Sequence, residues 1–191
     1  LFLYLPLMFM IVFSFNSTRQ DANFTGFSLR WYEALMRDTK LVEGFFLSLQ
    51  VAAITGVLSA VLGTFAAFVL VRYRRFSGRT FFSGMVNAPL VMPEVVIGLS
   101  LLLLMVGAQN AFGWPERGIL TIVLGHTLLG MSYGMVVIQS RLMEMNRSIE
   151  EAAMDLGAKP YQVFFLITLP NIFQAILAAF LLSFTLSFDD V

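Results

Sequence analysis

Residues 44–71 read GFFLSLQVAAITGVLSAVLGTFAAFVLV, a run without a single charged side chain. A helix needs about 20 consecutive, mostly apolar residues to cross the roughly 30 Å hydrocarbon core of a bilayer. The run exceeds that length, and a helix that is apolar on every side must be surrounded by lipid or by other apolar helices. It therefore predicts a transmembrane helix.

Four other stretches extend this pattern along the chain. Residues 1–18, 118–140 and 160–188 carry no charge, and residues 80–115 carry only Glu94. The first stretch is a partial span, and the membrane part of the last is expected to begin near Asn171, after Pro170. We predict an all-α, polytopic helical membrane protein with about five spans in a single domain covering residues 1–191.

The composition supports lipid as the solvent. Of 191 residues, 58% are apolar and 13% are charged, with a mean hydropathy of +0.81. Soluble domains are about 45–50% apolar and about 25% charged, so a soluble domain and a disordered chain are both excluded. Twelve basic residues balance twelve acidic ones, which does not suggest a nucleic-acid partner. Without cysteine and with one histidine, the chain offers no thiol nucleophile and no predicted metal site.

The two ends suggest a fragment. Leu1 already lies inside an apolar run, and no basic segment precedes that run. The chain stops at SFDDV, without a polar tail. We interpret the sequence as truncated at both ends.

The loops predict the orientation, because short loops rich in Lys and Arg usually stay in the cytoplasm. Residues 72–79 contain four cations and no acid, and residues 141–159 contain three further cations. Both loops are therefore expected in the cytoplasm. Residues 16–43 carry four cations matched by four acids, and alternation of the spans places them outside. The cations of the two cytoplasmic loops are Arg72, Arg74, Arg75, Arg79, Arg141, Arg147 and Lys159.

The second cytoplasmic loop has its own helical signals. Residues 148–170 read SIEEAAMDLGAKPYQVFFLITLP. Ser148 with Glu151 forms a capping-box pattern, which predicts a helix beginning at Ser148. Gly157 suits the left-handed position that ends such a helix. Pro160 then begins a second short helix, which is expected to end at Pro170.

The first of these helices combines a small apolar face with acidic neighbours. It could rest on lipid headgroups, but helices that do so usually carry Lys and Arg on their polar face. This helix is acidic there, so docking to a cytoplasmic protein is the favoured interpretation. The candidate docking residues are Glu150, Glu151, Ala152, Ala153, Asp155, Leu156 and Gly157.

Acidic and amide groups within or near the spans are candidates for a transport pathway. Ionisable side chains inside a membrane usually face a bundle interior or a cavity. Glu94 follows Pro89 and Pro93, which are expected to kink the third span, as in helices that line transport pathways. The candidate pathway residues are Asn87, Glu94, Asp189 and Asp190. A structural acid at Glu94 and a helix end at 189–190 remain the alternatives.

Other polar and small residues in the spans are expected to connect helices. His126 is interpreted as a helix–helix hydrogen bonder in preference to a proton relay. Small residues let membrane helices approach closely. The glycines expected at such contacts are Gly56, Gly63, Gly98, Gly125, Gly130 and Gly134.

The loop also resembles a known family. Glu151-Ala152-Ala153, then Gly157, then ITLP at 167–170, is similar to the EAA loop of permease subunits in bacterial ABC importers. The stretches APLVMPEV (88–95), GWPERG (113–118) and SFTLSFDD (183–190) resemble the polyamine importer permeases, and the putrescine permeases most of all.

This resemblance implies a six-span, MetI-like permease of the bacterial inner membrane, whose sixth span is absent here. It implies a second permease subunit, a cytoplasmic ATPase dimer that binds the ATP, and a periplasmic polyamine-binding protein as partners. Residues 148–170 would be the EAA coupling loop, and the permease itself would need no cofactor.

Two other functions remain open from the residues alone. An intramembrane enzyme could use Glu94, Asp189 or His126, and a self-contained cation channel would need no docking loop. The chain lacks the G-x-x-x-x-G-K-[ST] phosphate loop, so a transport subunit driven by a separate ATPase is the favoured interpretation.

Overall fold

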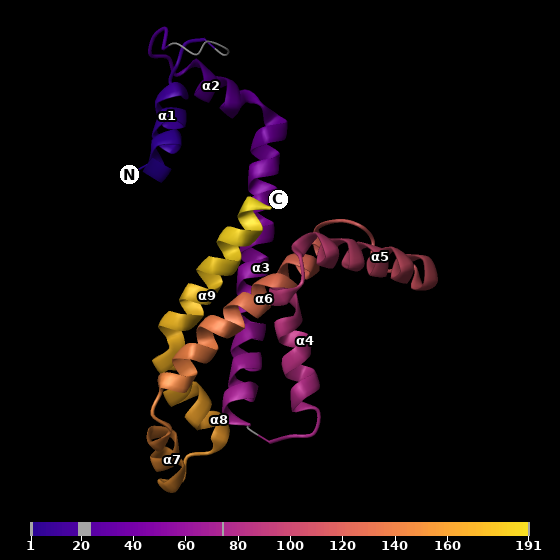
Figure 1. Ribbon diagram of the computed structural model, residues 1–191, viewed down its shortest axis with the longest axis vertical. Coiled ribbons are helices and arrows are strands. Elements are labelled where there is room, and N and C mark those ends of the chain that lie inside the picture. Colours follow the sequence, from indigo (N-terminus) through magenta and orange to yellow (C-terminus); the bar gives the residue numbers. More distant parts are fainter. Residues whose placement is uncertain (1, 19–23, 74, 191) are drawn as a thin grey trace. The chain divides into compact units, whose positions relative to one another are not determined.

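The computed structural model describes residues 2–18, 24–73 and 75–190, and these residues are predominantly helical (Figure 1). Leu1, Arg19 and Arg74, which the sequence predictions include, lie outside them. Four helices are long and apolar enough to span a membrane, and a shorter apolar helix covers Phe2–Phe13. The predicted helical membrane fold is confirmed. The four are α3 (Thr39–Arg72), α5 (Glu94–Phe112), α6 (Ile119–Glu144) and the continuous helix Pro160–Asp189.

The predicted third span consists of two helices. α4 covers Arg79–Val91 and α5 begins at Glu94, with Met92 and Pro93 in extended conformation between them. A proline disfavours the α conformation of the residue before it and cannot donate a backbone hydrogen bond. The prediction of one kinked helix is therefore wrong at Pro93, where the helix stops and a new one begins. Pro89, in contrast, lies inside α4.

Residues 48–191 form one compact unit whose core lies among α3, α4, α6 and α9 (Leu169–Asp189). In Figure 1, α6 and α9 run side by side, and α4 packs against α6. The helices meet through small residues and a few large ones. The buried core comprises Ala66, Ala67, Leu70, Val86, Met135, Ile138, Leu142, Ile172, Ala175 and Ala179.

Three of the predicted contact glycines lie where helices approach most closely. A Cβ on Gly63 would lie 3.0 Å from the backbone nitrogen of Met135, and one on Gly56 would lie 2.9 Å from the ring of Phe180. A Cβ on Gly130 would lie 2.5 Å from Ser59 Oγ. Gly98 differs, since a Cβ there would meet no atom within 4 Å.

A hydroxyl group ties α4 to α6. Ser132 Oγ lies 2.7 Å from the carbonyl oxygen of Val86, and the pair is buried. We expect Ser132→Ala to lower the free energy of unfolding by about 1 kcal/mol, because the link between the helices is lost. Thermal unfolding in detergent would measure this. Ser140→Ala is the control, because the exposed Ser140 hydroxyl bonds only within its own helix; an equal loss there would contradict the prediction.

Residues 1–47 form the other unit, which contains α1 (Leu5–Phe13) and α2 (Arg30–Arg37). Asn16 is buried there, and its side-chain oxygen accepts hydrogen bonds from the backbone N–H and the hydroxyl of Thr25. Trp31 Nε1 donates to the Asn16 carbonyl oxygen at 3.0 Å. Polar contacts thus hold together Asn16, Thr25 and Trp31 of the segment expected outside the membrane.

Candidate functional site

The docking helix predicted from residue 148 is α7 (Arg147–Asp155), and its N-cap lies two residues earlier than expected. Asn146, not Ser148, is the N-cap: its Oδ1 accepts from the backbone N–H of Ser148 at 3.0 Å. Glu151 pairs with Arg147 at 3.1 Å. The predicted capping box is therefore wrong, because α6 ends at Glu144 and leaves Asn146 free to cap the next helix.

The end of α7 agrees with the sequence prediction. Gly157 has φ +91°, in the left-handed region that strains other residues. Its N–H donates to the Met154 carbonyl at 2.9 Å, and the N–H of Ala158 donates to the Ala153 carbonyl at 3.0 Å. These two bonds form a Schellman motif, which fixes the direction of the chain after α7.

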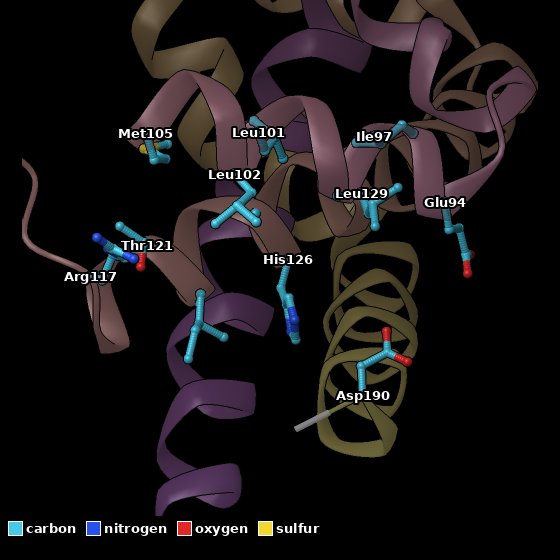
Figure 2. Close-up of a pocket in the computed structure, with 13 residues that line it drawn as sticks. Glu94, Ile97, Leu101, Leu102, Met105, Arg117, Thr121, His126, Leu129 and Asp190 are labelled. Carbon is cyan, nitrogen blue, oxygen red and sulfur yellow. The ribbon is translucent and has the colours of Figure 1, made fainter. Parts of the chain in front are cut away.

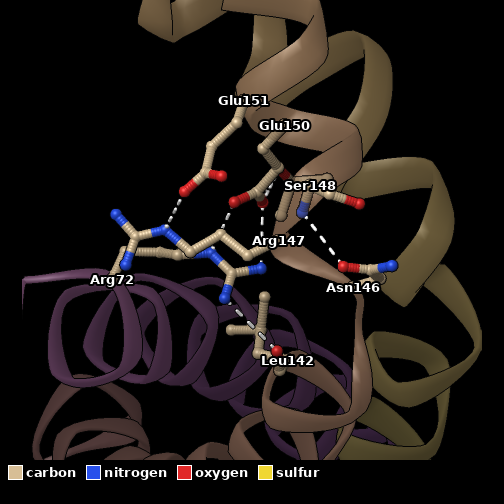
Figure 3. Close-up of polar contacts among 8 residues, drawn as sticks. Arg72, Leu142, Asn146, Arg147, Ser148, Glu150 and Glu151 are labelled. Atoms are coloured by element: carbon tan, nitrogen blue, oxygen red, sulfur yellow. Dashed lines mark hydrogen bonds and ion pairs between the residues drawn. The ribbon is translucent and has the colours of Figure 1, made fainter.

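The exposed surface of α7 contains most of the predicted docking residues. Leu156 is 91% exposed, Glu151, Ala152 and Asp155 are exposed, and Ala153 is half-buried. Glu150 is the exception, because its carboxylate is turned inward onto Arg72 (Figure 3). Its predicted place on an exposed acidic face is wrong: neighbouring helical residues point about 100° apart, so Glu150 and Glu151 cannot share a direction.

The second helix of the loop does not end at Pro170. α8 (Pro160–Val163) begins at the predicted proline and continues through the π-helical segment η2 (Phe164–Thr168) into α9. The backbone N–H of Leu169 donates to the Phe164 carbonyl, one residue further back than in an α-helix. Pro170 has no N–H, and the wider turn before it lets the helix continue where the sequence predicted a stop.

A cavity of about 450 Å³ lies between α5, α6 and the end of α9 (Figure 2). Glu94 begins α5, His126 projects from α6, and Asp190 follows the last residue of α9. These three residues also line a second, smaller pocket beside it. Figure 2 shows the carboxyl groups of Glu94 and Asp190 on one side of the cavity and Arg117 on the other.

The structure separates the four candidate pathway residues. Glu94 and Asp190 line the cavity together, whereas Asn87 and Asp189 do not line it. Asn87 lies before the break at Pro93, and its amide donates to the Ser83 carbonyl oxygen at 2.7 Å. Asn87 and Glu94 therefore do not share a helix face, because the two residues belong to different helices.

The sequence did not predict that His126 and Arg117 would line the same cavity. His126 Nδ1 lies 2.8 Å from Ser187 Oγ on α9, which confirms the predicted helix–helix hydrogen bond. One sequence feature could have indicated that His126 lines the cavity. The residue lies only about two helical turns after the loop between α5 and α6, which contains Arg117. Arg117 lies in that loop, where the sequence offered no partner for it.

Comparison with known proteins agrees with this architecture. Residues 59–191 match the family described as binding-protein-dependent transport system inner membrane component. The chain belongs to this family. It is therefore a helical, multi-pass permease subunit of the inner membrane, and the resemblance to ABC importer permeases seen in the sequence is confirmed.

Curated members of the family match this chain over its whole length. The chain is 53% identical to the putrescine transport system permease protein PotI of Escherichia coli K12 and covers 68% of that protein. It is 36% identical to the spermidine/putrescine transport system permease protein PotC of the same organism and covers 70% of it. The PotC of Haemophilus influenzae is 34% identical, with 72% covered.

Proposed function

We propose that this permease subunit carries polyamines, putrescine above all, into the cytoplasm as part of an ATP-driven importer. The observation that carries the proposal is the meeting of Glu94 and Asp190 at one cavity between α5, α6 and the end of α9. The names of the two Escherichia coli relatives agree with this substrate class.

The chemistry of the cavity suits an organic cation. A diamine carries two separated ammonium groups at neutral pH, and each is stabilised by a carboxylate that replaces lost water. Glu94 and Asp190 supply two such groups from different parts of the chain, and His126 adds a polar ring to the lining of the same cavity. We assign Glu94 and Asp190 to the pathway, with Asp189 next to it on α9 and Asn87 on the preceding helix.

We assign the energy source to a separate protein. Residues 148–170 form the EAA coupling loop in this proposal, and the exposed part of α7 binds a cytoplasmic ATPase dimer. A second permease subunit and a periplasmic polyamine-binding protein complete the importer. The chain acts as a transport subunit without ATPase chemistry of its own, in line with its lack of a phosphate-loop motif.

Uptake of radiolabelled putrescine by the reconstituted importer tests the proposed function. We expect ATP-dependent uptake that unlabelled spermidine reduces and that sodium or arginine leaves unchanged. Uptake of a different solute, without any competition by polyamines, would contradict the proposed substrate and leave the family assignment intact.

Docking of the ATPase depends on the turn after α7. Gly157→Val places a β-branched residue at φ +91°, which is strained by about 1–3 kcal/mol and would turn the exposed surface of α7 away from its partner. We expect co-purification of the ATPase to fall about tenfold.

Gly78→Val is the matched control for this prediction. Gly78 has φ +86° in the other cytoplasmic turn, and a Cβ there also meets no atom within 4 Å. The two variants thus carry the same local strain, but only one lies beside α7. Equal loss of the ATPase from both variants would contradict a specific role for the Gly157 turn.

A further inference from the structure

A buried ion pair connects α7 to the membrane helices (Figure 3). Arg72 Nε lies 2.7 Å from Glu150 Oε2, and Arg72 Nη2 donates to Glu150 Oε1 at 3.0 Å. The side chains are only 11% and 7% exposed. Nη2 makes the hydrogen bond of the pair, while Nε lies within ion-pair distance but does not have hydrogen-bond geometry.

The pair is bonded to two further elements. Thr168 Oγ1 donates to Glu150 Oε1 at 2.6 Å, and Thr168 is the last residue of η2, directly before α9. Arg72 Nη1 donates to the Leu142 carbonyl oxygen near the end of α6, at 3.4 Å. One cluster therefore joins the last residue of α3, the end of α6, the first turn of α7 and the start of α9.

Glu150 provides the most deeply buried contact of α7. Among the nine residues of α7, all of which the structure describes, Glu150 alone is buried. On the two sides of α7, Met145 packs against the core and the Gly157 turn sets the direction of the chain, but neither residue belongs to α7 itself. The position of α7 relative to the spans thus depends mainly on one charged side chain.

We infer that Arg72, Glu150 and Thr168 are positioning residues that transmit a displacement of α7 to α3 and α9. The inference rests on the proposed function, in which α7 binds the ATPase. An apolar contact lets two surfaces slide, whereas a buried ion pair whose carboxylate accepts hydrogen bonds from both Arg72 and Thr168 holds them in one geometry. Removing one partner leaves a buried charge without compensation, so α7 is held less firmly to α3 and α9.

The first test measures coupling in the assembled importer. We expect Glu150→Gln to retain assembly and ATP hydrolysis, while the ATP consumed per putrescine taken up rises about tenfold. The charge exchange Arg72→Glu with Glu150→Arg should return this ratio to within about threefold of the wild type. Arg141→Gln is the control, since it breaks an exposed ion pair with Glu144 and should leave the ratio unchanged.

A merely structural role predicts a different result. Hydrolysis and uptake would then fall together, in proportion to the amount of assembled importer, and the ratio would stay constant. That outcome, or normal uptake by Glu150→Gln, would overturn the inference.

The second test needs no transported solute. The chain contains no cysteine, so Met154→Cys and Phe173→Cys provide one spin label on α7 and one on α9 in an importer whose partner subunits lack cysteine. We expect the mean distance between the labels to be the same with and without bound ATP. In Glu150→Gln, the distribution of distances should become broader. If the wild type showed an equally broad distribution of distances, the inference that Arg72, Glu150 and Thr168 hold α7 in place would be overturned. Absence of putrescine uptake would instead contradict only the proposed substrate.

Discussion

Gly63→Leu is expected to abolish the folded protein. The helices α3 and α6 meet at Gly63 through backbone atoms: an added Cβ would lie 3.0 Å from the Met135 nitrogen and 3.2 Å from the Met131 carbonyl oxygen. A leucine side chain has three further carbon atoms, and backbone cannot rotate away as a side chain can. The helices must separate, and the buried contacts of Ala66, Ala67 and Ile138 are lost with them.

Overpacking of this kind costs about 1–3 kcal/mol for a few extra methylenes, and more where backbone is the obstacle. We therefore expect little monodisperse protein after extraction in detergent, and an intermediate yield for Gly63→Ala. Gly107→Leu is the control, because a Cβ at Gly107 meets no atom within 4 Å. If Gly63→Leu and Gly107→Leu gave equal yields, the close approach of α3 and α6 would be contradicted.

The sequence predicted the spans because their signal is local. A run without charge is visible in one stretch of chain, and so is the left-handed glycine that ends α7. The break at Pro93 was harder to predict from the sequence, because a proline shows that a helix is disturbed but not whether the helix continues in the same direction. The same limit applies at Pro170, where a π-helical turn lets the helix continue.

Long-range contacts account for the remaining differences. Glu150 and Glu151 are adjacent and chemically similar, so the sequence could not show which one points inward. The choice depends on Arg72, which lies 78 positions earlier in the chain. Likewise, Asn146 and Ser148 both suit an N-cap, and the end of α6 decides between them.

The residues of the cavity could be predicted from the sequence only in part. The sequence identified Glu94 and Asp190 as candidate pathway residues, because ionisable side chains inside a membrane usually face a bundle interior or a cavity. The sequence could not show that Asn87 lies away from the cavity, because the break at Pro93 separates it from Glu94. It also could not show that Arg117 lines the cavity, because this depends on how the loop between α5 and α6 folds. Neither could be obtained from periodicity.

Combined removal of the two cavity carboxylates is expected to have the largest effect on transport. Each carboxylate that compensates a desolvated ammonium group contributes about 1.4 kcal/mol or more, which corresponds to about tenfold in binding. We expect Glu94→Gln and Asp190→Asn each to reduce putrescine uptake about tenfold, and the double variant about a hundredfold, where their contributions are additive.

Both substitutions remove the negative charge and keep the size of the side chain, so a loss of uptake reports the charge and not the shape. Initial uptake rates at several putrescine concentrations, normalised to assembled importer, provide the measurement. Glu116→Gln is the matched control: Glu116 lies in the same outer region beside Arg117 but does not line the cavity. Since a diamine must pass both carboxylates to use this route, normal uptake by the double variant would place the pathway elsewhere in the importer.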